Sequence, residues 1–189
     1  VSQLQNLLKG EIPAFVVSAG PSLNKNIDQL KKVGSKGCII AVDTAIKPLL
    51  NRGIMPDFFV IVDGKKPTEL MNHPLISQIP LVTCTIVAKG IMDLHQGKKF
   101  YYTSDNPLEL LLFKEARNST GKVQDLYPTT LATGGSVANS AFSLAYFMNA
   151  KNIIFVGQDL ALTNNRTHAD GTFQEKMSKI SEREQKYTF

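Results

Sequence analysis

Short apolar runs alternate with amphipathic segments along most of the chain. Six of these runs have the length and composition of strands, and they cover residues 13–18, 37–43, 56–63, 80–85, 99–103 and 152–157. Runs that are apolar on both faces and end in turn residues are typical of parallel strands covered by helices on both sides. The pattern therefore predicts an α/β fold with a doubly wound, mostly parallel sheet in a Rossmann-like three-layer architecture.

The segments between these runs carry apolar residues at helical spacing. We expect helices over residues 2–9, 22–33, 44–52, 106–117 and 136–148. The last is the most regular, because Val137, Ala141 and Leu144 fall on one helical face. Ser22 or Asn24 can cap the second helix, since short polar side chains accept hydrogen bonds from the first free N–H groups.

Composition divides the chain into two unequal parts. Of the 189 residues, 43% are hydrophobic and 20% are charged, which is ordinary for a globular domain. Residues 1–173 fit one Rossmann-like domain that binds a nucleotide or nucleotide sugar. Residues 174–189 are strongly charged with few apolar anchors, and we expect them to form a helical tail truncated from a longer protein.

The net charge, the apolar runs and the two cysteines indicate which class of ligand and which cellular compartment to expect. Although the net charge is +5, Lys and Arg are scattered, which argues against nucleic acid and suits a phosphate-bearing ligand. No apolar run is long enough to cross a bilayer and the first residues lack a signal-peptide pattern, so we expect a cytoplasmic protein without a membrane partner. Cys38 and Cys84 each lie in an apolar run, which predicts buried, reduced thiols.

Polar residues follow several predicted strands at the ends where open parallel sheets bind their ligands. We expect contacts to a ribose or a sugar from Asp43, Thr44, Asp63, Thr85, Gln158 and Asp159. Each carboxylate in this set could instead hold Mg²⁺ or cap a turn.

Two turns of small residues stand before predicted helices. The first contains Ser18, Gly20, Pro21 and Ser22, and the second contains Thr133, Gly134, Gly135 and Ser136. Free backbone N–H groups at a helix start attract anions, so we expect both turns to contact a nucleotide or its phosphate. Either turn could also be a simple helix start.

His168 lies in a polar loop after the last predicted strand, near Arg166 and Asp170. A loop histidine with such neighbours can serve as a general base or contact phosphate, and it can also be an idle surface residue.

Several of these segments together resemble a known family. They are Ala19–Leu23, Ala41–Ala45, Gly53–Asp63, Thr133–Asn139, Gly157–Ala161 and the loop containing His168. In this order they resemble the central domain of bacterial motility accessory factors, which are implicated in adding nonulosonic acids to flagellin. The same superfamily is similar to archaeal 6-hydroxymethylpterin diphosphokinase and to bacterial sialyltransferases that use CMP-sialic acid.

The resemblance implies an activity and a role for each turn. It implies a glycosyltransferase that moves a nonulosonic acid from a CMP-linked donor to a protein hydroxyl, such as one on flagellin, with no cofactor required. The first turn would lie beside the nucleotide, the second would hold phosphate or a sugar carboxylate, and His168 would be the base.

Two other functions remain open at this point. A 6-hydroxymethylpterin pyrophosphokinase would use ATP and Mg²⁺, with Asp43, Asp63 and Asp159 as metal ligands. A non-catalytic module would bind the nucleotide without turnover.

Overall fold

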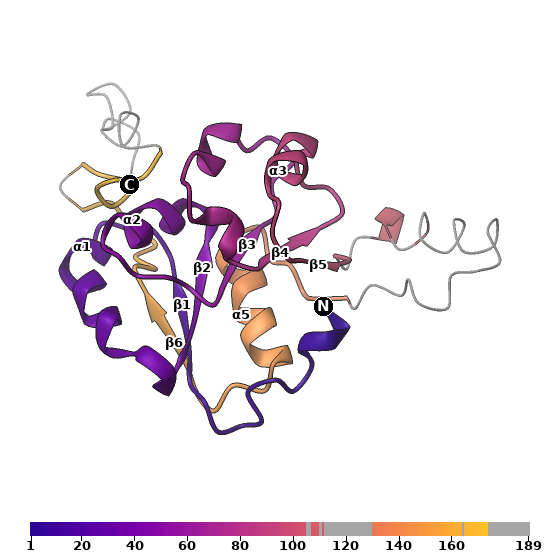
Figure 1. Cartoon of the computed structure of the whole chain (residues 1–189), viewed down its shortest axis with the longest axis horizontal. Coiled ribbons are helices and arrows are strands. Elements are labelled where there is room, and N and C mark those ends of the chain that lie inside the picture. The colour runs from indigo at the N-terminus through magenta and orange to yellow at the C-terminus, as the bar shows by residue number, and fades with distance from the viewer. Residues whose placement is uncertain (105–106, 110, 112–129, 164, 174–189) are drawn as a thin grey trace.

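The computed structural model describes residues 1–104, 107–109, 111, 130–163 and 165–173 (Figure 1). The predicted tail over residues 174–189 and most of the predicted helix over residues 106–117 lie outside the described residues.

One parallel sheet forms the centre of the domain. Its strands lie within the six predicted runs, and they are β1 (Ala14–Val17), β2 (Cys38–Val42), β3 (Phe58–Ile61), β4 (Leu81–Cys84), β5 (Lys99–Tyr102) and β6 (Ile153–Val156). The spatial order is β5-β4-β3-β2-β1-β6, and every neighbouring pair is parallel. The predicted Rossmann-like α/β fold is confirmed, and this sheet is parallel throughout.

The helices differ more from the sequence pattern than the strands do. The α-helices include α1 (Leu23–Asn26), α2 (Ile46–Asn51), α3 (Lys89–Leu94) and α5 (Val137–Phe147). Short 3₁₀ turns cover Ser2–Leu4, Ile27–Lys32, Gly34–Lys36, Asp43–Ala45, Thr68–Met71 and Ile76–Gln78.

Three helix predictions need correction. The helix expected over residues 22–33 is α-helical only from Leu23 to Asn26 and continues as a 3₁₀ helix from Ile27 to Lys32. Residues 2–9 contain one 3₁₀ turn instead of a helix. α2 begins only at Ile46, after the 3₁₀ turn at Asp43. The short α3, which contains Gly90, is absent from the prediction.

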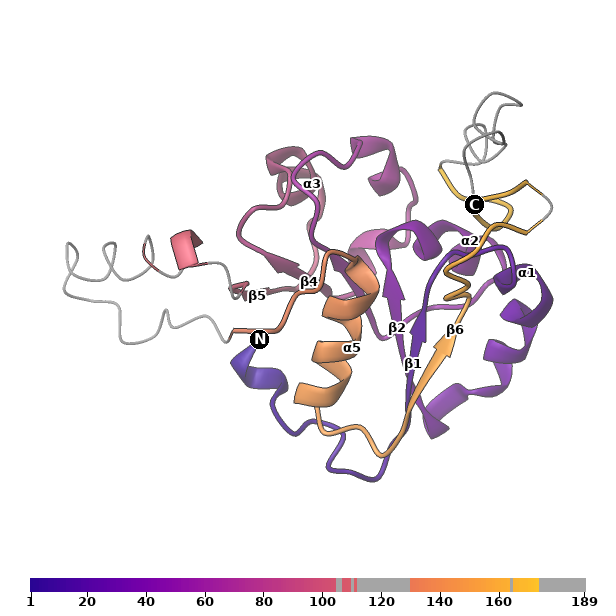
Figure 2. The same cartoon turned by 180° about the vertical axis from the view of Figure 1, so that it is seen from behind.

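The order of the strands creates a switch point between β1 and β6. The chain moves outward from β1 to β5 and then returns through α5, which packs on β1, β2, β3 and β6. Figures 1 and 2 show α1 and α2 on one side of the sheet and α5 on the other. The chain therefore leaves β1 through α1 on one side of the sheet and reaches β6 through α5 on the other, and open α/β sheets bind their ligands at the carboxyl ends of the strands at such a switch point.

The core occupies both faces of the sheet. β2, β3 and β4 are buried along their whole length, whereas the edge strand β6 leaves 48% of Phe155 exposed. Cys38 and Cys84 are free and buried, as predicted, and burial raises the pKa of the Cys38 thiol to about 12. In the part of the chain that the structure describes, no helix has the length and apolar character needed to span a bilayer.

Candidate functional site

A cavity of about 430 Å³ lies at the switch point. It is lined by residues that follow β1, β2 and β6, by the start of α5 and by the loop that contains His168. Of the predicted site residues, it brings together Ser18, Gly20, Asp43, Thr44, Ser136, Gln158, Asp159 and His168. The hydroxyl oxygen of Ser18 is buried and has no hydrogen-bond partner among the described residues.

Gly20 and Gly157 allow the turns after β1 and β6 to approach each other closely. The backbone N–H of Gly20 donates to the carbonyl oxygen of Gly157 at 2.7 Å. A Cβ atom on Gly20 would lie 2.6 Å from that oxygen, and Gly157 has a φ of +69°. The requirement for glycine at these positions therefore comes from the approach of the two turns.

Asp159 is bound to the start of α1. One of its carboxylate oxygens accepts the backbone N–H of Ser22 at 2.7 Å, and the other accepts the Ser22 hydroxyl. Asp159 lines the cavity, whereas Ser22 and Pro21 do not. The protein's own carboxylate therefore takes the position that the sequence suggested for a ligand anion at this turn.

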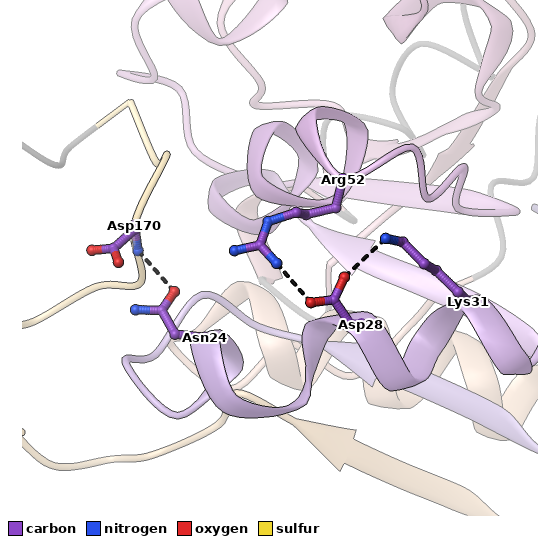
Figure 3. Close-up of polar contacts among 5 residues, drawn as sticks. All are labelled: Asn24, Asp28, Lys31, Arg52 and Asp170. Atoms are coloured by element: carbon purple, nitrogen blue, oxygen red, sulfur yellow. Dashed lines mark hydrogen bonds and ion pairs between the residues drawn. The ribbon is translucent and has the colours of Figure 1, made fainter.

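The loop that carries His168 is fixed to the turn after β1. The backbone N–H of Ala169 donates to the carbonyl oxygen of Ala19 at 2.8 Å. The N–H of Asp170 donates to Oδ1 of Asn24 at 3.1 Å, as Figure 3 shows. These bonds hold His168 at the mouth of the switch-point crevice.

The imidazole of His168 is suited to accept a proton. Its Nδ1 atom lies 2.9 Å from the Thr167 hydroxyl oxygen, and the side chain is half-buried. Burial lowers the pKa of His168 from its usual 6.5, the nearby Lys66 ammonium lowers it further, and Asp43 opposes them. The ring is therefore neutral at physiological pH, as a general base requires.

Asp43 forms a buried ion pair that the sequence did not indicate. Its Oδ2 atom lies 2.9 Å from Nζ of Lys66, with the two side chains only 2% and 13% exposed. Its Oδ1 atom accepts the N–H of Thr44 at 2.7 Å. Burial raises the pKa of Asp43, while Lys66 and this N–H act in the opposite direction. Lys66 follows β3 outside any motif, so the sequence carries no signal that points to it.

A second cavity of about 640 Å³ adjoins the first and shares Lys66, Ser136 and Val137 with it. The predicted residues Asp63, Thr133 and Gly135 line this cavity. Ser136 caps α5, because its hydroxyl oxygen accepts the N–H of Ala138 at 3.3 Å. The second small-residue turn therefore stands between the two cavities.

The remaining predicted residues, Thr85 and Gly134, line neither cavity. The hydroxyl of Thr85 donates to the Glu109 carboxylate, which also accepts the N–H of Ser104. The carbonyl oxygen of Gly134 accepts the side-chain amide of Asn139 at 2.5 Å. These contacts hold the loops that surround the second cavity.

The three carboxylates considered for a metal have separate surroundings. Asp43 pairs with Lys66, Asp159 bonds Ser22, and Asp63 accepts the N–H of Lys65 at 2.8 Å. Across the described ranges, no three His, Cys, Asp or Glu side chains lie close enough together to hold a metal ion.

Comparisons with known proteins agree with this architecture. A family model described as "6-hydroxymethylpterin diphosphokinase MptE-like" matches residues 1–165. The solved structure of a MAf glycosyltransferase from Magnetospirillum magneticum AMB-1 superposes with a TM-score of 0.68 and 22% identity, over 82% of this chain and 24% of that chain.

Two uncharacterized proteins of Treponema pallidum (strain Nichols) share shorter segments. One is 42% identical over 53 residues, which are 28% of this chain and 14% of that protein. The other is 40% identical over 50 residues, which are 26% of this chain and 24% of that protein. The matched segments thus span a quarter or less of each relative.

Proposed function

We propose that this domain transfers a group from a nucleotide-linked donor. The chain belongs to the 6-hydroxymethylpterin diphosphokinase MptE-like family, and the proposal starts from that membership. The similar solved structure is that of a glycosyltransferase, which favours a sugar as the transferred group. We further propose a CMP-linked nonulosonic acid as donor and a protein hydroxyl, such as one on flagellin, as acceptor.

One observation carries this proposal. A neutral histidine, a buried carboxylate and an unpartnered buried hydroxyl meet around one cavity at the switch point of a parallel sheet. This is the place where open α/β sheets bind nucleotides and related ligands. Perturbed titratable groups that line such a crevice favour catalysis over simple packing.

The proposed chemistry is a displacement at the anomeric carbon. His168 accepts the proton of the acceptor hydroxyl while the hydroxyl oxygen forms the new bond to that carbon. The bond from the anomeric carbon to the donor phosphate breaks, and the electron pair leaves with CMP. Backbone N–H groups at Ser136 and at the start of α5 stabilise the negative charge that develops on the leaving phosphate.

The other residues that line the cavities would orient the donor. Asp43, Thr44 and Gln158 supply hydrogen-bonding groups for ribose or sugar hydroxyls at the first cavity. Asp63 and Thr133 supply them at the second. Asp159 contributes indirectly, because it fixes the turn at Ser22.

A thermal-shift series tests the donor class. The purified chain is measured with CMP, CDP, UDP, GDP and ATP, each with and without Mg²⁺, because a ligand that binds only the folded state raises the melting temperature. We expect stabilisation by cytidine nucleotides without metal. His168→Ala should then retain CMP binding and lose sugar transfer, and unchanged transfer by this variant would exclude His168 as the base.

The description of the family model favours a second candidate, the Mg²⁺-dependent pyrophosphokinase, because it names a diphosphokinase. This activity requires Mg²⁺, and Asp43 and Asp63 would have to exchange their present partners, the Lys66 ammonium and the Lys65 N–H, for the metal. Stabilisation by ATP only in the presence of Mg²⁺ would support this candidate. Tight nucleotide binding with no turnover would instead indicate a binding module.

A further inference from the structure

Lys66 occupies the wall between the two cavities. Within the described residues, it is the only Lys or Arg side chain that lines either cavity, and it lines both. Its Nζ atom lies 2.9 Å from Oδ2 of Asp43 and 5.5 Å from the centre of the Phe173 ring. The Lys66 ammonium therefore lies where the two adjoining cavities meet.

This ammonium has more donors than Asp43 can use. A lysine carries three N–H donors, and Asp43 presents only its Oδ2 atom within ion-pair distance of the group. Only 13% of the Lys66 side chain is exposed, so its charge acts in an environment where electrostatic attraction is stronger than in water. A ligand anion at the shared wall would therefore gain a charged hydrogen bond.

Two further features of the first cavity favour an anion near Lys66. The Ser18 hydroxyl is buried there without a partner in the described part of the chain. The first residues of α5, Val137 and Ala138, line the same cavity beside Ser136, at the positive end of an eleven-residue helix. The start of α1 offers no comparable place, because Asp159 already occupies it.

We propose that Lys66 binds the anionic group of the donor, a phosphate or a sugar carboxylate, at the junction of the two cavities. This inference rests on the proposed function, because it assigns a residue to the recognition of that donor. The competing explanation is that Lys66 only neutralises the buried carboxylate of Asp43.

The experiment uses variants that separate these two explanations. Lys66→Met alone leaves Asp43 buried without its partner, which is expected to destabilise the fold strongly. The double variant Asp43→Asn/Lys66→Met removes both charges, and Asp43→Asn alone is its reference, because it keeps the ammonium. Lys65→Met is the matched control, since Lys65 is exposed and lines neither cavity.

Paired probes isolate the anion by titration calorimetry. CMP is compared with cytidine for the phosphate, and N-acetylneuraminic acid is compared with its methyl ester for the carboxylate. We expect wild type and Lys65→Met to bind one anionic probe about 10- to 100-fold more tightly than its neutral counterpart, as for a charge-assisted hydrogen bond. Asp43→Asn should bind both members of that pair more weakly and keep their ratio, because it keeps the ammonium. The double variant should lose most of the ratio, and the start of α5 accounts for what remains.

The outcomes are distinct. Loss of the preference in the CMP pair assigns Lys66 to the phosphate, and loss in the sugar pair assigns it to the carboxylate. If the double variant keeps the full preference, or if CMP and cytidine lose affinity equally, the assignment of Lys66 is wrong while the proposed function stands. If wild type binds none of the nucleotides or sugars, the proposed function fails.

Discussion

The carboxylate of Asp159 accepts hydrogen bonds from both the backbone N–H and the hydroxyl of Ser22. Asp159 follows β6 and Ser22 precedes α1, so this contact joins the two sides of the switch point. The two donors of Ser22 at the start of α1 therefore already bond a carboxylate of the protein itself. The helix N-terminus that lines the cavities is that of α5, where Ser136, Val137 and Ala138 are located.

Replacing Asp159 with Ala should destabilise the domain by about 1–3 kcal/mol, because two donors at Ser22 lose a charged acceptor. Ser22→Ala is the control, since it loses the hydroxyl bond and keeps the backbone N–H bond to Asp159. We expect a smaller loss for this control. Urea unfolding followed by circular dichroism measures both, and equal stability of Asp159→Ala and wild type would show that the contact contributes nothing.

Gly157→Ala should be far more harmful than Gly135→Ala. Both glycines have a φ of +69°, so both substitutions carry the same backbone strain of about 1 kcal/mol. A Cβ on Gly157 would lie 2.3 Å from the carbonyl oxygen of Ser18, whereas a Cβ on Gly135 meets nothing within 4 Å. The difference between the two free energies of unfolding measures the close approach of the turns. Similar values for the two variants would contradict that approach.

The pKa of His168 should respond in opposite directions to its two charged neighbours. Lys66 lowers this pKa and Asp43 raises it. Asp43→Asn should therefore shift the titration to lower pH than in wild type, and removing the ammonium as well, in Asp43→Asn/Lys66→Met, should shift it to higher pH than in Asp43→Asn. NMR titration of the imidazole signal, assigned by its absence in His168→Ala, measures both shifts. A shift of the same sign in both steps would contradict the charge arrangement.

Acid should destabilise the domain through His95. This side chain is fully buried, its Nε2 lies 3.0 Å from the carbonyl oxygen of Ile79, and its ring packs on Phe59. Burial lowers the pKa of His95 below its usual 6.5. The unfolded chain therefore binds a proton at a higher pH than the folded chain, so stability falls as the pH drops below about 6.5.

Unfolding by urea between pH 8 and pH 5 measures this dependence. His95→Phe should lose its share of the slope that begins near pH 6.5, while the ring position against Phe59 remains filled. His168→Ala is the comparison, because the pKa of His168 is lowered as well and its removal should take away a separate share of the slope. An unchanged slope in His95→Phe would mean that other groups cause the acid sensitivity.

The sequence located the candidate site through one local regularity. Polar residues that follow buried strands, such as Asp43 and Asp63, line the cavities because parallel strands end at one edge of the sheet. Thr85 follows the same rule and instead bonds Glu109, since the position after a strand does not fix the partner of its side chain. The sequence did not predict Lys66 as a site residue, because its partner Asp43 belongs to another βα unit.

The sequence by itself determined the six strands and the parallel α/β class, because continuous apolar runs between helical segments are a local pattern. It did not determine which strand lies beside β1. Only the tertiary structure brings β6 to β1, and with it the Gly157 turn to Gly20, Asp159 to Ser22 and the His168 loop to Ala19. These contacts join residues more than a hundred positions apart, and they depend on strand order and packing that local spacing does not encode.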